Sequence, residues 1–374
     1  MKCDIIMPIW NQLEHTKNCI DRVIKNTGCP YRLILVDNAS DRATKDYLDG
    51  LKNNKPQDVT LIRNGSNLGF VKAVNQAMRV STAPYVCILN NDTLPTKGWL
   101  ERLLEFAESH KDAGIVNPLC SAPTGADLDK YAESIAGDRS AYMEMNQCFL
   151  FCALIKREVI DKIGYLDEAF GMGCYDDTDY SMRAGIAGYR CASVHSSLVH
   201  HLDGTSFKAL GTRKALEEKG AEIYFNKWPR HLRVGLACSV DRATGDGELE
   251  NILRGVLFLA REWCWVNLWI FGDVKENGAR VDKTSKKFGM PSHQNIKFNY
   301  MPGNFSGITV LFKLIERSFG TKKRKKYDIV MVDNEKTAAL LEVFRFIHNT
   351  EIMIFRTGAD ILDSKPALDR IKKR

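Results

Sequence analysis

The sequence contains no C-x-x-C pair, although it has 11 cysteines. An odd number of cysteines without metal-ligand spacing argues against a disulfide framework and a zinc site, so we expect reduced thiols in the cytosol. A large excess of one charge is also missing, because 53 Lys and Arg residues stand against 46 Asp and Glu residues, a net charge of +7. With so small an excess, and without interleaved aromatic and basic residues, the sequence argues against a nucleic-acid partner.

A long uncharged apolar run is missing as well. The most apolar stretch of the later sequence, residues 252–272, contains Arg254, Arg261 and Glu262, which is too much charge for a membrane-spanning helix. The first residues, Met1–Pro8, do not show the basic, apolar and small-residue profile of a signal peptide, and they predict a strand. We therefore expect a cytoplasmic protein without a membrane span.

The sequence does contain an alternation of short apolar runs and amphipathic stretches over residues 1–120. Two of the runs, Leu33–Val36 and Val86–Leu89, are apolar throughout, which indicates strands buried on both faces, as in a parallel sheet covered by helices. The alternation restarts in the last part of the chain, and 374 residues with 44% apolar content suit two domains. We expect an α/β domain over residues 1–232 and a smaller, Rossmann-like α/β domain over residues 233–374.

The expected elements of the first domain alternate regularly. The strands are Cys3–Met7, Arg32–Val36, Val59–Ile62, Tyr85–Leu89 and Gly114–Asn117, and the helices are Gln12–Lys25, Arg42–Asn53, Phe70–Val80 and Lys97–Ser109. Residues 121–147 have little periodicity and predict an irregular excursion, which a buried strand over residues 148–155 follows.

Polar residues follow each of the first four expected strands, where ligands of a parallel sheet gather. Capping of a following helix explains Ser40 and Asp41 about as well as a functional role does, at about 1 kcal/mol for each cap. It explains Asn90–Asp92 less well, because the signals of a helix start appear only at Pro95. In chain order the four groups are Pro8, Trp10 and Asn11, then Asp37 and Asn38, then Asn67 and Gly69, then Asn90, Asn91 and Asp92.

Two further polar segments occur later in the chain. Asp176 and Asp177 follow a glycine-containing loop, and His200 and His201 follow an expected strand. Acids at the start of a helix interact favourably with its dipole by about 0.3–1 kcal/mol, and this is the role we expect for Asp179. The glycines of the loop indicate a close bend, which favours a functional role for the first two acids.

Six segments in this order, over residues 3–208, resemble the inverting family 2 glycosyltransferases with the GT-A fold, particularly their rhamnosyltransferase-like branch. The resemblance implies a GT-A fold, a Rossmann-like mixed sheet with helices on both faces. The segments are Met7–Asn11, Leu35–Ser40, Asn67–Phe70 with Asn75, Leu89–Thr93 followed by Gly98–Leu100, Asp176–Arg183, and Val199–His201 with Gly204–Ser206.

The resemblance implies a UDP- or dTDP-linked sugar donor. Asp37 and Asn38 match positions that contact the nucleobase, where a carboxylate or an amide pairs with the N3–H group of uracil or thymine. Trp10 would line the same pocket as a stacking surface, and the alternative is an aromatic side chain in the core or at its rim. The other implied donor contacts are Pro8, Asn11, Asn67, Gly69, Asn75, Asn90 and Asn91.

A divalent metal, Mn²⁺ or Mg²⁺, is also implied. Asn90–Asp92 takes the place of the family's Asp-x-Asp motif and departs from it, because the first acid is replaced by Asn90. Asp92 and His200 are the expected ligands, with diphosphate oxygens and water completing the shell. His201 is the alternative ligand, because adjacent residues of an extended segment point to opposite faces.

Asp177 matches the position of the catalytic base, and Asp176 would orient the acceptor or the base. The implied acceptor is a glycan or a lipid-linked molecule, as in polysaccharide biosynthesis. The basic run Lys322–Lys326 is either a solvated loop or a peripheral contact with the inner face of an acidic membrane. The second domain resembles the first half of a GT-B glycosyltransferase at Gly245–Gly247, and we assign it no activity. The alternative function is a nucleotide-sugar-binding module that has lost catalysis with the acid at Asn90.

Overall fold

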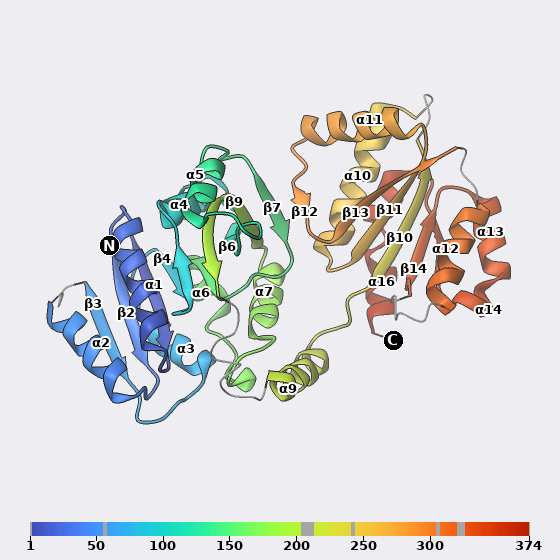
Figure 1. The fold of residues 1–374 in the computed structure, drawn as a ribbon. Helices are drawn as coiled ribbons and strands as arrows, with labels where there is room; N and C mark the ends of the chain where they lie inside the picture. Colours follow the sequence, from blue (N-terminus) through green and yellow to red (C-terminus); the bar gives the residue numbers. More distant parts are fainter. Residues whose placement is uncertain are drawn as a thin grey trace. The chain divides into compact units, whose positions relative to one another are not determined.

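The computed structural model describes residues 2–54, 58–202, 213–240, 244–303, 307–319 and 326–373. The chain forms two compact units, Met1–Lys227 and Trp228–Arg374, which we call the first and the second unit (Figure 1). The sequence placed this division between residues 232 and 233.

The first unit is built on a mixed sheet. Its strands follow the order β7-β9-β6-β8-β4-β1-β2-β3, and β5 pairs with β9. The strands are β1 Cys3–Ile9, β2 Tyr31–Asp37, β3 Val59–Arg63, β4 Tyr85–Leu89, β5 Thr93–Pro95, β6 Ala113–Leu119, β7 Tyr142–Met145, β8 Cys152–Lys156 and β9 Arg190–His201. Strands β4, β1, β2 and β3 are parallel, whereas β8 is antiparallel to β4 and to β6.

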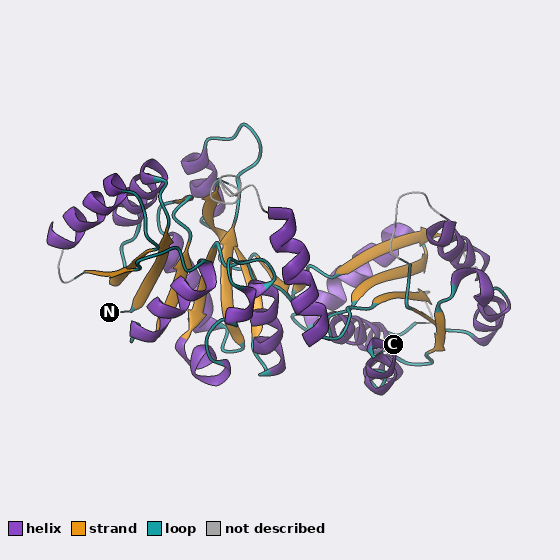
Figure 2. Ribbon diagram, turned by 90° about the horizontal axis from the view of Figure 1, so that it is seen from below, coloured by secondary structure: helices purple, strands orange, loops and turns teal. Residues whose placement is uncertain are grey.

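Helices cover both faces of this sheet (Figure 2). On one face, Met7 of β1 packs in a buried cluster with Ile20 of α1 and Leu103 of α4. Ile6 points to the opposite face because successive strand residues alternate, and helix α3 contacts β1 and β2 from outside that cluster. The helices are α1 Leu13–Asn26, α2 Arg42–Asn54, α3 Phe70–Val80, α4 Trp99–Ser109, α5 Leu128–Ile135, α6 Arg157–Ile163, α7 Asp176–Ile186 and α9 Arg213–Lys227, with a 3₁₀ turn at Glu168–Phe170. The expected mixed α/β sheet with helices on both faces is confirmed.

The expected irregular excursion over residues 121–147 was wrong in part. Asp127 caps helix α5 by accepting a hydrogen bond from the Lys130 amide, and β7 pairs antiparallel with β9. The apolar residues Leu128, Tyr131, Ala132 and Ile135 fall at the i, i+3, i+4, i+7 spacing of a helix, a signal that sequence reasoning missed, although only Ala132 is buried. The expected strand over residues 148–155 begins later, at Cys152, because Asn117 binds the backbone of Phe149 and so holds the preceding residues outside the ladder.

The second unit has a sheet in the order β13-β11-β10-β14-β15 with parallel pairings throughout. This is the doubly wound arrangement of Rossmann-like folds, so the expected second α/β region is confirmed. Its strands are β10 Arg233–Ser239, β11 Trp265–Gly272, β12 Ser292–His293, β13 Ile296–Pro302, β14 Ile329–Val332 and β15 Glu351–Ile354. Its helices are α10 Asp246–Arg261, α11 Val274–Lys287, α12 Gly307–Phe319, α13 Glu335–Val343, α14 Arg345–His348, α15 Gly358–Leu362 and α16 Lys365–Lys372.

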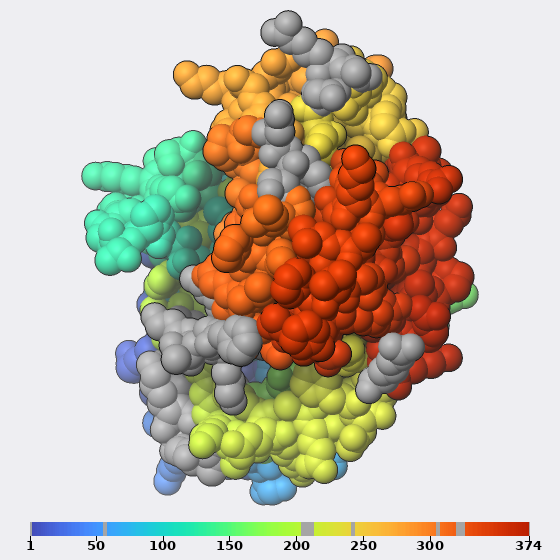
Figure 3. Space-filling model, turned by 90° about the vertical axis from the view of Figure 1, so that its right-hand side faces the viewer, coloured from blue at the N-terminus to red at the C-terminus, as the bar shows by residue number. Residues whose placement is uncertain are grey.

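The core of the second unit also has two sides. Leu236 and Leu253 belong to a cluster between the sheet and α10, whereas Trp269 and Val310 belong to a second cluster that includes α12. The C-terminal helices, coloured red, form much of the surface that Figure 3 shows of this unit. Gly245, which carries the GT-B resemblance, directly precedes α10.

None of the helices in the described ranges combines the length and the apolarity that crossing a bilayer requires.

Candidate functional site

The candidate site lies where strands of the first unit end. The parallel strands β4, β1, β2 and β3 bring their carboxyl ends to one edge of the sheet, and β5 then pairs Thr93 with His201 at the end of β9. This pairing places the residue before β5, Asp92, beside the end of β9. The chain separates these residues widely, and the sheet brings them together.

Asp92 and His201 form a pair in this edge. Asp92 Oδ1 lies 3.3 Å from His201 Nε2, and the Asp92 backbone oxygen accepts a hydrogen bond from the Leu202 amide. The His201 ring stacks on Phe151, with 5.0 Å between ring centroids and 13° between planes. His200 lies opposite Leu94 in the ladder, and its Nδ1 is buried without a partner in the structure as described. The structure therefore places His201, the alternative ligand, beside Asp92.

This pair can supply two ligands of one divalent ion, a carboxylate oxygen and an imidazole nitrogen. Over the described ranges, no group of three or more His, Cys, Asp or Glu side chains could hold a metal. Mg²⁺ commonly takes one or two protein ligands and completes its shell with substrate phosphates and water. The donor set therefore fits a metal that is shared with a diphosphate.

The two asparagines before Asp92 do not point to the same place. The Asn91 amide donates to Thr16 Oγ1 over 2.9 Å, so this side chain anchors the turn to α1 instead of contacting a donor. The Asn90 amide nitrogen of the backbone donates to Phe151 O over 2.8 Å, and its side-chain oxygen Oδ1 is buried without a partner in the part of the chain described here. The Asn90 side chain thus has an unsatisfied acceptor beside the Asp92–His201 pair.

The acid pair stands at the start of α7, after a loop with unusual backbone angles. Gly171, Gly173, Cys174 and Tyr175 all have positive φ values, from 55° to 116°. For the two residues that are not glycine, this conformation costs roughly 1–2 kcal/mol each. Such strain persists only where the surrounding structure imposes it, and it gathers at functional sites.

Burial changes the acidity of both carboxyl groups. It raises the pKa of Asp176 to about 7, and the neighbouring charge of Asp177 adds to the shift. Burial also raises the pKa of Asp177, although hydrogen bonds from Thr178 and Gln147 oppose this effect. The contacts are 2.7 Å from the Thr178 amide to Asp177 Oδ1 and 3.4 Å from Gln147 Nε2 to Oδ2. The charge of one carboxyl group therefore opposes the ionisation of the other, and the two titrate as an interacting pair.

Helix α9 packs against the loop of residues 171–175, which precedes the two acids and which we call the acid loop. Sequence reasoning missed this role of α9. Gly220 packs so closely that a Cβ atom there would lie 2.6 Å from Cys174 O. The rings of Tyr175 and Tyr224 lie 5.5 Å apart. Lys227 reaches Asp179 over 2.7 Å.

Asp179 lies in the first turn of α7, as expected for an interaction with the helix dipole, and it has a second role as well. Its buried carboxylate binds Arg183 over 2.9 Å as well as Lys227, so it ties α7 to α9 through ion pairs. The sequence signal that could have predicted the ion pair within α7 is Arg183, four residues further along the same helix.

The expected nucleobase contacts, Asp37 and Asn38, are buried and already hydrogen-bonded. Asp37 accepts from the Ser40 amide over 2.8 Å and from Arg63 over 2.9 Å. The Asn38 amide donates to Asn67 over 3.0 Å and to Gly69 O over 3.1 Å, and its oxygen accepts two further hydrogen bonds. The structure thus brings these four residues into one network, where they shape the edge of the site. A direct contact with a base stays a prediction.

The loops after β1 and β2 are tied to each other. The backbone amide of Asn11 donates to Ser40 Oγ over 2.9 Å, and the side-chain oxygen Asn11 Oδ1 accepts from the backbone amide of Asp41 over 2.7 Å. Asn11 and Ala39 both have positive φ values, 56° and 63°. Pro8 and Trp10 are half-buried at the same place. This loop pair is the remaining candidate wall of a base pocket.

Asn75, an expected donor contact, ties α3 to the segment of Leu166 and Glu168. It is buried, its amide donates to Leu166 O and Glu168 Oε1, and its oxygen accepts from the Leu166 amide, over 2.9, 3.2 and 3.0 Å. Its polar capacity is spent on the segment that leads to the acid loop, which the sequence alone did not reveal.

Gly69, which directly precedes α3, lies against the acid loop. Its φ is +85°, and a Cβ atom there would lie 2.8 Å from Gly171 O. The Val71 amide donates to the same oxygen over 3.3 Å. Gly69 therefore has to be glycine for two reasons, its backbone angle and its contact with the acid loop.

Comparison with known proteins gives a family match over part of the first unit. Residues 4–164 match the family model described as Glycosyl transferase family 2. Among curated proteins, Glycosyltransferase GlyG of Streptococcus pneumoniae is 24% identical over 114 residues, covering 30% of this chain and 36% of GlyG. The uncharacterized glycosyltransferase YwdF of Bacillus subtilis is 23% identical over 203 residues, covering 52% of this chain and 73% of YwdF. The chain thus spans about a third of the length of one relative and most of the other.

Solved structures with a similar outline include mannosyltransferase PcManGT from Pyrobaculum calidifontis, in complex with GDP-Man and Mn²⁺. Its TM-score is 0.46 at 17% identity, covering 57% of this chain and 61% of that chain. S. aureus TarS 1-349 in complex with UDP-GlcNAc gives a TM-score of 0.43 at 14% identity, covering 56% and 61%. The family model covers residues 4–164, which is less than half of this chain.

Proposed function

We propose that the protein is a metal-dependent, inverting glycosyltransferase of the rhamnosyltransferase-like branch. It would move one sugar from a UDP- or dTDP-sugar to a hydroxyl group of a glycan or lipid-linked acceptor. One observation supports this most, the short segment that joins the acid pair to the Asp92–His201 pair.

That segment runs from Gln147 to Phe151. At one end Gln147 contacts the carboxylate of Asp177, and at the other end Phe151 stacks on His201 and accepts a hydrogen bond from Asn90. Four residues of extended chain span at most roughly 14 Å. One short segment thus contacts both Asp177 and the Asp92–His201 pair, as a site with a donor side and an acceptor side requires.

The chemistry follows from this placement. Asp177, as a carboxylate, would take the proton of the acceptor hydroxyl while that oxygen attacks the anomeric carbon from the side opposite the diphosphate. Burial suits this task, because a raised pKa makes Asp177 a stronger base once it has lost its proton. A divalent ion, when bound, supplies Lewis-acid stabilisation of the leaving diphosphate, and Asp92 and His201 would hold it.

A nucleotide-sugar-binding module without turnover is the second candidate, and Asn90 favours it because the family's first acid is missing there. Melting temperatures with Mn²⁺ and a panel of UDP- and dTDP-sugars would identify the donor, since a ligand that binds the native state raises the melting temperature. Release of UDP or dTDP from that donor would then support the enzyme. A donor that binds without any release, with and without candidate acceptors, would support the binding module.

We also propose peripheral contact with an acidic membrane at its cytoplasmic face. The residues Lys322–Lys325 and Gly204–Ser206 lie outside the described ranges. Support comes from two exposed phenylalanines, Phe312 on α12, which is 66% exposed, and Phe346 on α14, which is 82% exposed. Flotation with acidic liposomes should weaken when both are changed to serine. The matched control is Ile186→Ser, which removes an apolar side chain that is 70% exposed on α7.

A further inference from the structure

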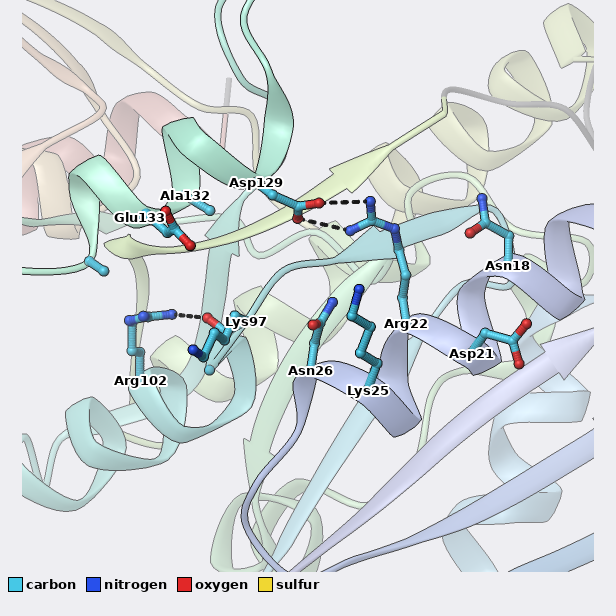
Figure 4. A pocket seen from close by; sticks show the side chains of 12 residues that line it. Asn18, Asp21, Arg22, Lys25, Asn26, Lys97, Arg102, Asp129, Ala132 and Glu133 are labelled. Atoms are coloured by element: carbon cyan, nitrogen blue, oxygen red, sulfur yellow. Dashed lines mark hydrogen bonds and ion pairs between the residues drawn. The ribbon is translucent and has the colours of Figure 1, made fainter.

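A groove in the first unit is lined by none of the residues discussed above as site residues. It is bounded by α1, by the turn between β5 and α4, and by α5, and its volume is about 720 Å³. Pockets of this size commonly hold small molecules. Figure 4 shows Lys25 and Asn26 on α1, Lys97 and Arg102 beside them, and Asp129 on α5.

Positive charge in this groove is only partly compensated. Arg22 and Asp129 neutralise each other through two hydrogen bonds of 3.0 and 3.2 Å. Lys25, Lys97 and Arg102 have no carboxylate within 4.0 Å among the residues that the structure describes. Three cations from α1, the β5–α4 turn and α4 therefore line one groove without a counter-charge in contact.

The acids of the neighbouring elements are engaged elsewhere. On α4, Glu101 accepts hydrogen bonds from the backbone amides of Gly28 and Cys29, and Glu105 pairs with Arg139. On the groove wall, Asp21 and Glu133 make no ion pair with the three cations in the described structure.

Arg102 shows the lack of compensation most clearly. Its guanidinium donates to Lys97 O over 2.6 Å, and its Nε is buried without a partner in the described part of the chain. The side chain folds back over Gly98 at the start of α4, where a Cβ atom would lie 3.2 Å from Arg102 Nη1. An anion in the groove would supply the missing counter-charge.

We propose that this groove binds an anionic saccharide, a phosphate- or carboxylate-bearing part of the acceptor. Lys25, Lys97 and Arg102 would hold the anionic group, because guanidinium and ammonium groups are the usual partners of phosphate and carboxylate. Asn18 and Glu133 line the same groove and can bind hydroxyl groups. The acceptor role rests on the proposed function, whereas the binding itself does not.

The groove adjoins the transfer site along the chain. Pro95 O, at the end of β5, accepts hydrogen bonds from Asn26 over 2.8 Å and from Arg22 over 3.4 Å. Asp92 and Lys97 are five residues apart, a span of at most roughly 18 Å. A glycan held here would therefore have its reacting end within a few sugar units of Asp92.

Binding of defined oligosaccharides to the full chain tests this inference. The probes are an oligogalacturonide tetramer with carboxylates, a glycerol phosphate tetramer with phosphodiesters, and neutral maltotetraose. We expect at least one anionic probe to bind, more weakly as salt rises. The double variant Lys25→Gln/Lys97→Gln should weaken this binding about tenfold or more. Both side chains are exposed, so their replacement should leave folding intact.

The control is Lys111→Gln, an exposed lysine outside the groove lining. The inference is overturned if maltotetraose binds as tightly as the anionic probes or if none of the three binds. Equal effects of the double variant and Lys111→Gln would also overturn it. The inference would likewise be overturned if the protein bound acidic vesicles in a charge-dependent way but bound none of the oligosaccharides. The anionic probe that binds more tightly shows whether the groove prefers phosphate or carboxylate groups.

The same experiment separates this inference from the proposed function. Anionic binding without any donor turnover would leave the groove as a saccharide site and remove the transferase. Donor turnover without binding of either anionic probe would keep the transferase and remove the groove.

Discussion

At the scale of single residues, two neighbouring carboxyl groups stand at the start of one helix of the first unit, Asp176 buried and Asp177 half-buried. Asp176 has its pKa raised to about 7 by burial and by Asp177, so it keeps its proton over much of the acidic range. The sequence predicted that these acids matter, because they follow a bending loop and match a family position. It did not predict their coupling, which depends on burial and on Gln147, a residue with no motif around it.

Asp176→Asn should change the pH dependence of stability. The folded-state pKa of Asp176 lies above the usual value of a free carboxyl, so its ionisation opposes folding as pH rises from about 4 through about 7. The variant should therefore be more stable than the original protein at pH 8, by up to a few kcal/mol, and equally stable near pH 4. Melting temperatures across this range measure the effect. Asp161→Asn, at an exposed acid, should show no such divergence.

His201→Ala should weaken Mn²⁺-dependent nucleotide binding, because the protein then offers one metal ligand instead of two. We expect a loss of about tenfold or more when Mn²⁺ is present and little change in its absence. Titration calorimetry with UDP or dTDP measures both. His195→Ala is the control on the same strand, and equal losses in the two variants would assign His201 a packing role on Phe151.

At the scale of elements, the sequence predicted those with strong periodicity and missed those defined by long-range contacts. Helix α3 was predicted with its observed bounds, and β4 likewise, because each has a clear apolar pattern between turn residues. The strand β5 has three residues, and nothing local indicates that it would pair with β9 and so place His201 beside Asp92. The support of the acid loop by α9 was equally hidden, since it depends on a glycine contact between distant segments.

Gly220→Ala tests this support. The new Cβ would lie 2.6 Å from Cys174 O, a backbone atom, so the acid loop has to move. We expect a loss of stability of about 1–3 kcal/mol and a lower turnover, because Asp176 and Asp177 follow this loop. Chemical denaturation and donor turnover measure the two effects.

Gly50→Ala is the matched control, since Gly50 is a helical glycine of α2 with nothing within 4 Å of the added Cβ. It should stabilise the protein by about 0.5–1 kcal/mol and leave turnover unchanged. If Gly220→Ala gives the same stabilisation, α9 does not hold the loop.

At the scale of the whole molecule, the chain has two units with separate cores, and the candidate site lies in the first. The sequence indicated the restart of the α/β pattern, and the structure divides the chain after Lys227. Residues 1–227 contain the strands β1 to β9, the acid pair and the helix α9 that supports it.

Residues 1–227, produced alone, should fold and melt cooperatively, because the buried cluster around α1 and α4 closes within this unit. The fragment should also bind the same nucleotide as the full chain. Circular dichroism melting and calorimetry check both expectations. A fragment that is unfolded, or folded without nucleotide binding, would show that the second unit completes the site.

The central claim is that Asp177 is the base of a transfer site whose donor side is Asp92 and His201. The most direct test compares the original protein with Asp177→Asn in two assays, nucleotide binding with Mn²⁺ and release of UDP or dTDP from the donor. The account predicts unchanged binding and a loss of turnover of at least about a hundredfold. Turnover that survives the replacement would contradict it.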